Sequence, residues 1–489
     1  MSEVDARRRA IFFVLSLGVF AYGLLQSLVF PVLPTLEHSL HTSQANVTWI
    51  LTANLVSAAI ATPLLGRYGD IVGKKPTFVL ALGSLAVGSL VAALATSLLP
   101  MLLGRVIQGL GGATLPLAFG LIRDEFPVEK VPGAVGTVAG LMAVGSGAGI
   151  ALGGPIIDAL DYHWLFWIPL VVVSLATVVA WVVIPESSVR GEGRMNFFAA
   201  LLLSGWLVTL LLAVSEAPDW GWATPSVLGL FAAAAILLPA WVVAESRSAS
   251  PLIDMRMMRA RSVWTTNLSA LLFGVGLYSV LVFVPGFLQA PSSAGYGFGV
   301  SISEAGIMVL PLTTMMFVFG LCTGSLARRF GSKNVVIVGM ALGTLAFSML
   351  TYVHATELDI YLTMAVMGVG FGMSACALAN LIVASVPREQ VGVASGMNAN
   401  IRTIGGAIGA SLASSVLVSS TPASGIPNES GYANVFLLCA GATALSLFAA
   451  FLIPRVRRSS PTRREPAVAP RHAELAYVGR AALVGNEPE

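Results

Sequence analysis

Charged residues are scarce in this chain of 489 residues: they make up 10% of it, whereas hydrophobic residues make up 56%. A soluble domain of ordinary composition carries roughly 25% charged residues. The apolar residues also fall into long blocks, which are typical of helices that cross a bilayer. The composition therefore excludes a soluble globular protein and predicts an all-α membrane protein with many spans.

Cysteine and histidine are scarce as well. The three cysteines, Cys322, Cys376 and Cys439, all lie within apolar runs, where cysteine packs as a small buried hydrophobe. The five histidines fall in expected loops or in the C-terminal tail and form no metal-binding spacing. The sequence thus gives no sign of a disulfide framework, a metal site, a cofactor or a nucleic-acid partner.

Motifs for ATP hydrolysis and for intramembrane catalysis are also missing. No loop of the form G-x-x-x-x-G-K-[ST] occurs, which argues against a primary pump. The apolar runs contain no serine–histidine pair and no metal-ligating cluster, which argues against an intramembrane hydrolase. A sensor would need a soluble output domain, and we find no segment of that composition. We therefore expect a protein that is not an enzyme.

Fourteen apolar runs are long enough to cross a bilayer, because a spanning helix needs about 20 residues. They cover 11–33, 47–67, 77–96, 98–121, 132–157, 164–184, 196–215, 225–244, 264–289, 303–327, 334–353, 360–384, 392–418 and 433–453. An even number of spans places both termini on the same side of the membrane.

The loops between these runs alternate in charge. Lysine and arginine lie before the first run and after even-numbered runs, whereas the loops after odd-numbered runs contain no lysine or arginine and carry acidic residues instead. Basic residues concentrate on the cytoplasmic side of membrane proteins. We therefore expect a multi-pass protein of the plasma membrane with both termini in the cytoplasm.

The stretch between the second and third runs, PLLGRYGDIVGKKP at 63–76, is dense in glycine and charge. Its pattern G-x-x-x-D-x-x-G-K-K is formed by five residues: Gly66, Asp70, Gly73, Lys74 and Lys75. Glycine allows a tight turn and close helix packing. A carboxylate at a helix end in a membrane needs a partner, so we expect Asp70 to act as a latch and the two lysines to face lipid headgroups.

A weaker copy of this stretch at 324–333 suggests two related halves. We therefore predict a six-helix bundle at 11–184, two inserted helices at 196–244 and a second six-helix bundle at 264–453. The tail at 454–489 is rich in Arg, Pro and Ala, and we expect it to be disordered in the cytoplasm. Transporters built from repeats bind their substrate near the midplane between the halves.

Only two basic residues lie inside the runs, Arg105 and Arg402. A charge at membrane depth costs at least about 2.5 kcal/mol on insertion scales, so each is a functional hypothesis. Gln108 follows Arg105 by one turn, and Asn398 precedes Arg402 on the same helical face. The alternative for both arginines is a structural role, in which the guanidinium donates hydrogen bonds to exposed carbonyl groups.

The fifth run contains a ladder of small residues that ends in a proline. The members that we single out are Gly145, Gly149, Gly153, Gly154 and Pro155. Small residues at helical spacing allow close and pliable packing. They form either an interface between moving bundles or a simple packing surface, and the two interpretations are compatible.

Polar positions inside the runs are candidates for lining a cavity, although each alone is more often a packing residue. These candidates are Tyr22, Gln26, Asn54, Gln108, Asn267, Tyr278, Asn398 and Arg402. No Asp or Glu falls near the middle of a run, where a proton carrier would be expected. The remaining candidates for proton coupling are Arg105, Asp158 and Glu304. The alternative for each of the two acids is a solvated position without a part in coupling.

Together these motifs resemble the major facilitator superfamily, in particular its drug:proton antiporter branch with fourteen helices. The resemblance rests on the 63–76 loop, LGRVIQGLGGA around Arg105, the glycine-rich fifth run and NANIRTIGGAIG at 398–409. It implies two six-helix bundles plus two additional helices. It also implies that the Asp70 loop governs switching between inward and outward states, that the Arg105 motif serves proton transfer, and that the fifth-run motif is associated with export.

Three positions depart from that family's pattern. Leu25 stands where members often carry an Asp in the first helix, Gly149-Ile150 replaces the usual Gly-Pro, and Ile71 replaces a common arginine. The missing acid removes the usual reason to expect a preference for cationic substrates.

We accordingly expect a proton-coupled exporter of hydrophobic small molecules such as drugs, antibiotics or metabolites, working as a monomer in the lipid bilayer. Two intramembrane arginines without a midplane acid favour neutral or anionic substrates. The alternatives are an importer or facilitator of one metabolite on the same fold, or a membrane sensor that transports nothing.

Overall fold

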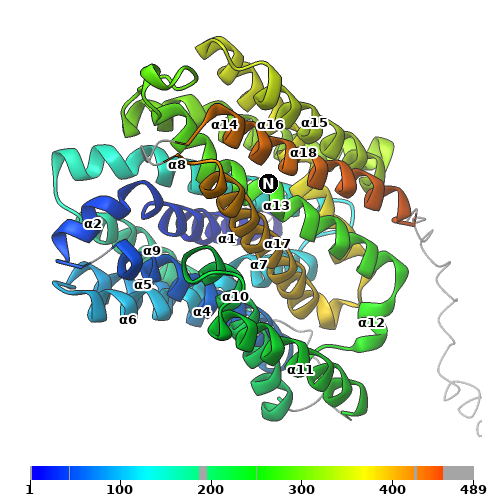
Figure 1. The fold of residues 1–489 in the computed structure, drawn as a ribbon. Coiled ribbons are helices and arrows are strands. Elements are labelled where there is room, and N and C mark those ends of the chain that lie inside the picture. Colours follow the sequence, from blue (N-terminus) through cyan, green and yellow to red (C-terminus); the bar gives the residue numbers. More distant parts are fainter. Residues whose placement is uncertain (1–2, 43, 187–194, 249–250, 423–426, 455–489) are drawn as a thin grey trace, which may run out of the picture. The chain divides into compact units, whose positions relative to one another are not determined.

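The computed structural model describes residues 3–42, 44–186, 195–248, 251–422 and 427–454, and the regular elements in these ranges are all helices (Figure 1). The predicted tail at 454–489 lies outside them from residue 455 onward, as do Arg190 and Arg194, the basic residues of the loop after the sixth run. Within the described ranges, fourteen helices are long and apolar enough to cross a membrane, which confirms the number predicted from hydropathy.

The long helices have the following bounds: α1 Glu3–Ser27, α4 Trp49–Val72, α5 Lys74–Ala93, α6 Leu98–Gly109, α7 Thr114–Glu125, α8 Val131–Ala159, α9 Trp164–Val183, α10 Phe197–Trp220, α11 Pro225–Arg247, α13 Arg261–Gln289, α14 Ile302–Phe330, α15 Ser332–Tyr352, α16 Glu357–Ser385, α17 Val391–Ser419 and α18 Glu429–Leu452. Shorter helices connect them: η1 Phe30–Val32, α2 Leu33–Ser39, α3 Gln44–Val47, α12 Met255–Arg259, η3 Ser292–Ala294 and η4 Arg388–Gln390.

One predicted span is interrupted. Helices α6 and α7 are joined by a 3₁₀ turn, η2 (Leu110–Ala113), and together they form the span Leu98–Glu125. The turn is rich in glycine because α4 and α5 pass very close: a Cβ at Gly112 would lie 2.7 Å from the Thr62 hydroxyl, and one at Gly111 would overlap Leu85. Close packing at this point depends on residues without side chains.

The helices form two bundles. In the N-terminal bundle α1 packs on α8 and α9, and α5 packs on α6 and α9. In the C-terminal bundle α13 packs on α17 and α18, and α16 packs on α14 and α15. The main contacts between the bundles are those of α8 with α14 and of α4 with α17.

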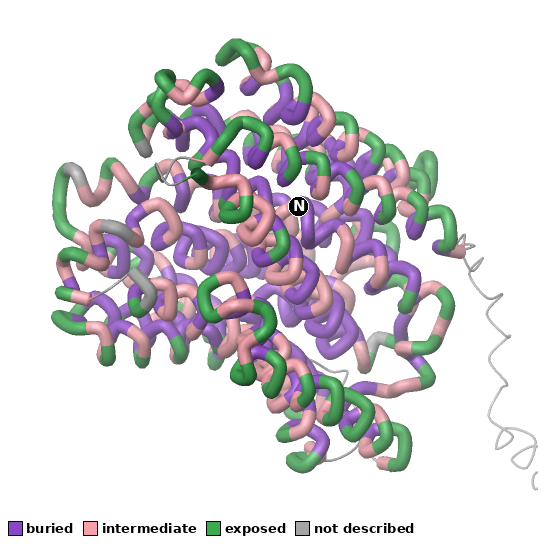
Figure 2. Tube along the Cα trace, viewed as in Figure 1, coloured by how far each residue is buried: buried purple, intermediate pink, exposed green. Residues whose placement is uncertain are grey.

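The inserted pair α10–α11 touches both bundles through α10, which contacts α4 and α17. The Ser411 hydroxyl of α17 donates to the Val214 carbonyl of α10 at 2.6 Å, and the Trp222 indole donates to Ser415 at 2.8 Å. Helix α11 is largely exposed (Figure 2), and large apolar side chains such as Ile236 and Leu228 lie on its surface. An exposed apolar face of this kind suits contact with lipid.

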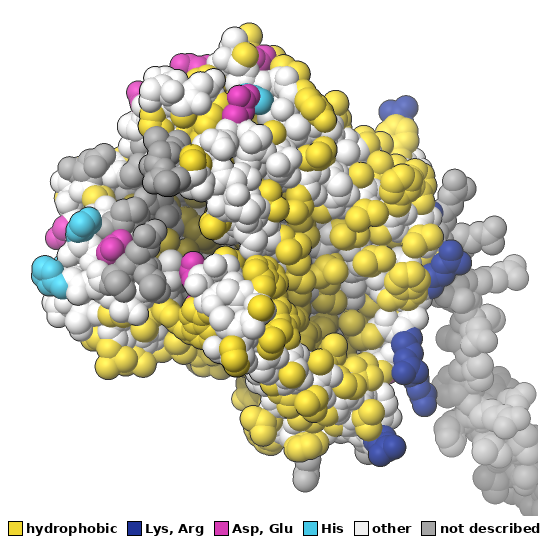
Figure 3. Space-filling view, in the orientation of Figure 1, with side chains coloured by type: hydrophobic (Ala, Val, Ile, Leu, Met, Phe, Trp, Pro, Cys, Tyr) yellow, Lys and Arg dark blue, Asp and Glu magenta, His cyan; other side chains and the backbone are white. Residues whose placement is uncertain are grey.

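Charge separates the two ends of the helices. On the face shown in Figure 3, lysine and arginine gather at one end and acidic residues and histidine at the other. We call these the basic end, where α4 finishes and α5 begins, and the acidic end, where α16 begins with Glu357. Between them hydrophobic side chains cover much of the face, as expected for a surface in a bilayer.

Candidate functional site

A cavity lies between the two bundles. Its wall includes side chains of α1, α7 and α8 from one bundle and of α13, α14, α16 and α17 from the other. The empty space within it, including the space that is open to solvent, is about 1170 Å³. Most lining residues are apolar, among them Phe119, Met142, Phe273, Leu277 and Leu281. An apolar cleft with few polar groups is typical of a small-molecule site.

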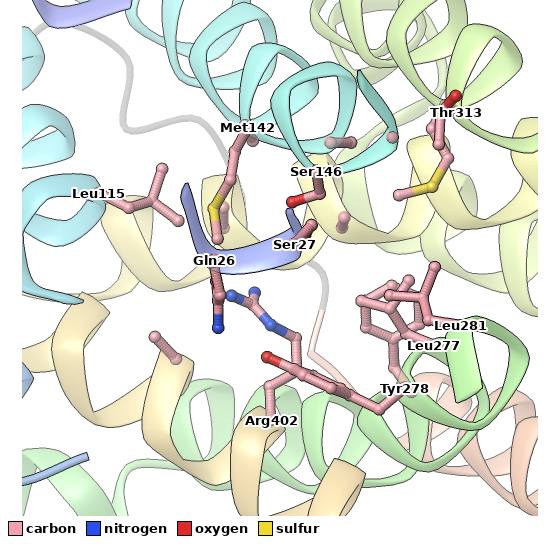
Figure 4. Close-up of a pocket in the computed structure, with 18 of the residues that line it drawn as sticks. Gln26, Ser27, Leu115, Met142, Ser146, Leu277, Tyr278, Leu281, Thr313 and Arg402 are labelled. Carbon is pink, nitrogen blue, oxygen red and sulfur yellow. The ribbon is translucent and has the colours of Figure 1, made fainter. Parts of the chain in front are cut away.

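Three polar side chains from three helices converge on this cavity. Gln26 of α1, Tyr278 of α13 and Arg402 of α17 point toward a common space (Figure 4). The same three residues, with Tyr22, line a smaller adjoining cavity. Sequence reasoning named all four as cavity candidates, and the structure brings them together at the boundary between the two cavities.

The two intramembrane arginines have different surroundings. Arg105 is 1% exposed, and its guanidinium donates to the Ile50 carbonyl at 3.1 Å and to the Gln108 side chain at 2.7 Å. Gln108 in turn donates to Ser89, and Asn54 donates to the Arg105 carbonyl. These bonds tie α4, α5 and α6 together inside the N-terminal bundle. Arg105 therefore has the bonding of a structural arginine, whereas Arg402 faces the cavity.

The remaining predicted cavity residues divide in the same way. Asn398 lines the cavity, but its amide donates to Asn267 of α13 at 2.8 Å, so the pair joins α17 to α13. Asn54, Gln108 and Asn267 are absent from the walls of both cavities described here. Their polarity serves contacts within a bundle, which sequence alone does not distinguish from a lining position.

Asp70 forms a contact between the bundles at the basic end. Its carboxylate, which is fully buried, accepts the Val393 backbone N–H of α17 at 3.1 Å. Gly66, one turn earlier, lies against Gly392, and a Cβ there would be 2.8 Å from the Gly392 carbonyl oxygen. Gly73 ends α4 with φ +136°, a conformation that favours glycine. The predicted latch therefore has a specific partner, the first turn of α17.

Lys74 does not face the headgroups, contrary to the prediction from sequence. It is fully buried, with its ammonium 2.8 Å from Asp124 of α7 and 3.9 Å from Asp70. Gly120 makes room for its stem, since a Cβ there would lie 2.8 Å from the lysine Cδ. The two carboxylates compensate the buried charge, as burial requires. Lys75 is half-buried instead, and its ammonium lies 5.8 Å from the centre of the Trp181 ring.

Further hydrogen bonds join the bundles in the half of the helices nearer the basic end. The Arg123 guanidinium donates to the Val383 carbonyl, Asn380 donates to the Pro132 carbonyl, and Cys376 donates to the Gly136 carbonyl. Nearer the middle, Asn400 donates to the Ala59 carbonyl. Sequence reasoning did not predict these bonds, because each acceptor is a backbone carbonyl on another helix and leaves no sequence signal.

The glycine ladder of α8 has two faces. Gly145 and Gly149 lie against α1, where a Cβ at Gly149 would be 2.7 Å from the Leu24 carbonyl oxygen, and Gly153 lies against Leu28 and Pro31 just after α1. Gly147, on the other face, meets Thr313 of α14 in the other bundle. Gly154 is half-buried and Pro155 is exposed. The ladder thus packs within its own bundle along one face and against the partner bundle along the other.

Glu304, one of the two predicted acidic carriers, lies apart from the cavity lining. Glu304 is exposed and closes a capping box with Ser301 at the start of α14, a helix-capping arrangement. The side chain of Asp158 lies outside the described residues. Two acids that sequence reasoning did not single out are buried, Glu216 of α10 and Glu245 of α11. Glu245 accepts the Leu252 N–H at 2.9 Å, which secures the chain after α11.

Comparison with known proteins places this arrangement in a family. The chain is 30% identical to the tetracenomycin C resistance and export protein of Streptomyces glaucescens, over 86% of this chain and 78% of that protein. It is 29% identical to the multidrug transporter protein MdtP of Bacillus subtilis, over 76% of this chain and 68% of that protein.

Among solved structures, the fold resembles that of the human organic anion transporter MFSD10, with a TM-score of 0.67 and 17% identity over 92% of this chain and all of that one. At this identity the likeness concerns the fold alone. The sequence profile of the Major Facilitator Superfamily matches residues 15–410. The chain, with its fourteen spans and a cavity between two bundles, is therefore a member of the Major Facilitator Superfamily.

Proposed function

We propose that this chain exports hydrophobic small molecules across the plasma membrane in exchange for protons, by alternating access and as a monomer. The observation that carries the proposal is the largely apolar cavity lined by both bundles, since a site shared by two halves can be opened to either side by their relative movement. The name of one relative, a resistance and export protein, supports the choice of export, and that of the other, a multidrug transporter, supports drug-like substrates.

The orientation of the chain follows from its charges. If the basic end faces the cytoplasm, as basic loops generally do, both termini are cytoplasmic, and the Asp70 contact lies between the cavity and the cytoplasm. The division into bundles at 11–184 and 264–453, with an inserted pair at 196–244, belongs to the same proposal. Arg105, Asp158 and Glu304 stay the candidates for proton coupling.

Transport in proteoliposomes tests the proposal. The purified chain is reconstituted with a lipophilic dye, and dye movement is followed with an imposed pH gradient, without one, and with a protonophore. We expect movement that depends on the gradient and is abolished by the protonophore, with little movement in liposomes that hold an equal amount of Arg105→Ala. Movement that does not depend on the gradient would instead favour a facilitator. Movement of the dye in the same direction as the protons would favour an importer. No movement of any dye by folded protein would favour a dedicated metabolite transporter or a sensor.

The two faces of the glycine ladder give a paired prediction. Gly147→Ala places a methyl group against Thr313 across the bundle interface, whereas Gly145→Ala places one against the α1 backbone inside a bundle. Overpacking costs about 1–3 kcal/mol. We expect Gly145→Ala to lower the Tm of the purified protein, and Gly147→Ala to lower the transport rate several-fold with a smaller change in Tm.

The comparison uses equal amounts of both variants in the same lipid. If Gly147→Ala lowers the Tm as much as Gly145→Ala and transports at the wild-type rate, the Gly147 face has only a packing role.

A further inference from the structure

The Arg402 guanidinium lacks a counter-charge. Within the described part of the chain it makes no hydrogen bond and no ion pair, although it lines both cavities. Arg105 shows the contrast, since its guanidinium bonds a carbonyl and a glutamine side chain and is absent from both walls. Bonds of the kind that Arg105 makes therefore do not account for the position of Arg402.

The cavity wall supplies no carboxylate to compensate this charge. Arg402 is the one charged residue in the walls of the two cavities as the described residues define them. Among the described residues, the buried acids have other positions: Asp70 and Asp124 surround Lys74, Glu245 binds the Leu252 N–H, and Glu216 of α10 is absent from both walls. A cation held in an apolar site without a partner is costly, so a ligand that brings a negative charge gains more here than a neutral one.

The neighbours of Arg402 add directed hydrogen-bonding groups. Tyr278 and Gln26 point into the same space and can each donate to an oxygen held by the guanidinium (Figure 4). The hydroxyl of Ser395, which also lines the cavity, is buried and has no partner among the described residues. These groups suit an oxyanion, because guanidinium and hydroxyl donors bind carboxylate or sulfonate oxygens strongly.

The rest of the wall suits an apolar body. Phe273, Leu277 and Leu281 of α13 and Phe119 and Met142 of the other bundle form a surface of rings and aliphatic chains beside the polar group. Aromatic and thioether side chains adapt to flat ring systems. The cavity thus combines one positive charge with a broad apolar surface.

We infer that the substrate of this cavity is a lipophilic organic anion, an aromatic body with one ionised acidic group that pairs with Arg402. The inference rests on the proposed transport function and adds the substrate class to it. It gives Arg402 the part of a specificity determinant, with Gln26 and Tyr278 as supporting donors.

Equilibrium binding of three probes that share one ring system tests the inference. Pyrenebutanoate is anionic, pyrenebutanol is neutral and pyrenebutylammonium is cationic. Binding is measured by dialysis against the full chain in nanodiscs of zwitterionic lipid, with empty nanodiscs subtracted. We expect the anion to bind at least about 10-fold more tightly than the alcohol, since hydrogen bonds to charged groups exceed neutral ones by about that factor, and the ammonium to bind most weakly.

Variants assign the preference to one residue. Arg402→Gln should bring the affinity for pyrenebutanoate down to that for pyrenebutanol and leave the alcohol unchanged, which also shows that the cavity is intact. Arg402→Lys should keep part of the preference. The matched control is Arg329→Gln, which removes the same charge from an exposed position at the basic end, and it should bind all three probes as the wild type does.

The outcomes separate this inference from the proposed function. Equal binding of anion and alcohol by the wild type, tighter binding of the ammonium, no binding of any probe, or an anion preference that survives in Arg402→Gln would each overturn the inference. Proton-driven export of dyes without a charge preference would leave the proposed function standing and refute the substrate class. Anion binding that depends on Arg402, without proton-driven movement, would support the substrate class and refute proton-driven export.

Discussion

Lys74→Met is expected to destabilise the folded protein by about 3–5 kcal/mol, the cost of breaking a buried ion pair by removing one partner. The lysine is fully buried and lies between Asp124 and Asp70, so its removal leaves two carboxylates in an apolar interior without their cation. The stem loses its packing against Gly120 to a smaller extent, because methionine is similar in length. Thermal unfolding in a fixed lipid mixture, followed with the amount of folded protein in the membrane, measures the effect.

Two further variants separate the charge from the packing. Lys75→Met removes the adjacent lysine, whose ammonium lies over the Trp181 ring, and should cost about 0.5–1 kcal/mol. Lys74→Met with Asp124→Leu removes both members of the closer pair and should recover part of the lost stability, because an apolar pair avoids the desolvation cost. A Tm for Lys74→Met equal to that of Lys75→Met would contradict a compensating role for the buried lysine.

The number of spans could be predicted from the sequence, whereas the buried location of Lys74 could not. The first depends on consecutive residues and the second on a residue that is distant in the sequence. Hydropathy is a property of consecutive residues, so runs of about 20 apolar residues reveal helices without any knowledge of their neighbours. The burial of Lys74 depends on Asp124, which belongs to α7 and lies 50 residues away in the sequence. A lysine beside a loop reads as a surface residue until its partner in space is known.

The arginines show the same limit. Both Arg105 and Arg402 were identified by their cost in a membrane, which depends only on composition. The difference between them depends on their neighbours in space, which are Ile50 and Gln108 for Arg105 and the cavity for Arg402. Likewise, the helical period predicts that Gly145 and Gly147 occupy different faces of α8. It does not predict that one face meets α1 and the other α14.

Asp70→Asn is expected to weaken the contact between the bundles at the basic end by about 1–1.5 kcal/mol, the difference between a hydrogen bond to a charged acceptor and one to a neutral acceptor. We call the arrangement in which this contact is made the closed state. That difference corresponds to an increase of roughly 5- to 10-fold in the open fraction. The carboxylate is the acceptor for the Val393 N–H, and this bond links α4 to α17 across the two bundles. Turnover should therefore fall more than substrate affinity does, since Asp70 is not part of the cavity wall.

A cysteine reporter measures the closed state directly. Ser395 lines the cavity one turn into α17, so Ser395→Cys, in a chain without Cys322, Cys376 and Cys439, can be labelled only when a reagent reaches the cavity. In everted vesicles, a maleimide that does not cross membranes approaches from the basic end under the proposed orientation. The labelling rate should rise roughly 5- to 10-fold in Asp70→Asn, in line with the larger open fraction.

The second carboxylate at Lys74 provides the matched control, because Asp124→Asn alters the ion pair and leaves the Val393 acceptor in place. Faster labelling in Asp70→Asn than in Asp124→Asn would assign the closed state to the bond between bundles. Equal labelling in both variants would place the effect in the charge balance around Lys74. Unchanged labelling with unchanged turnover in Asp70→Asn would show that the other contacts of this end, those of Arg123 and Asn380 with backbone carbonyls, hold the bundles together without it.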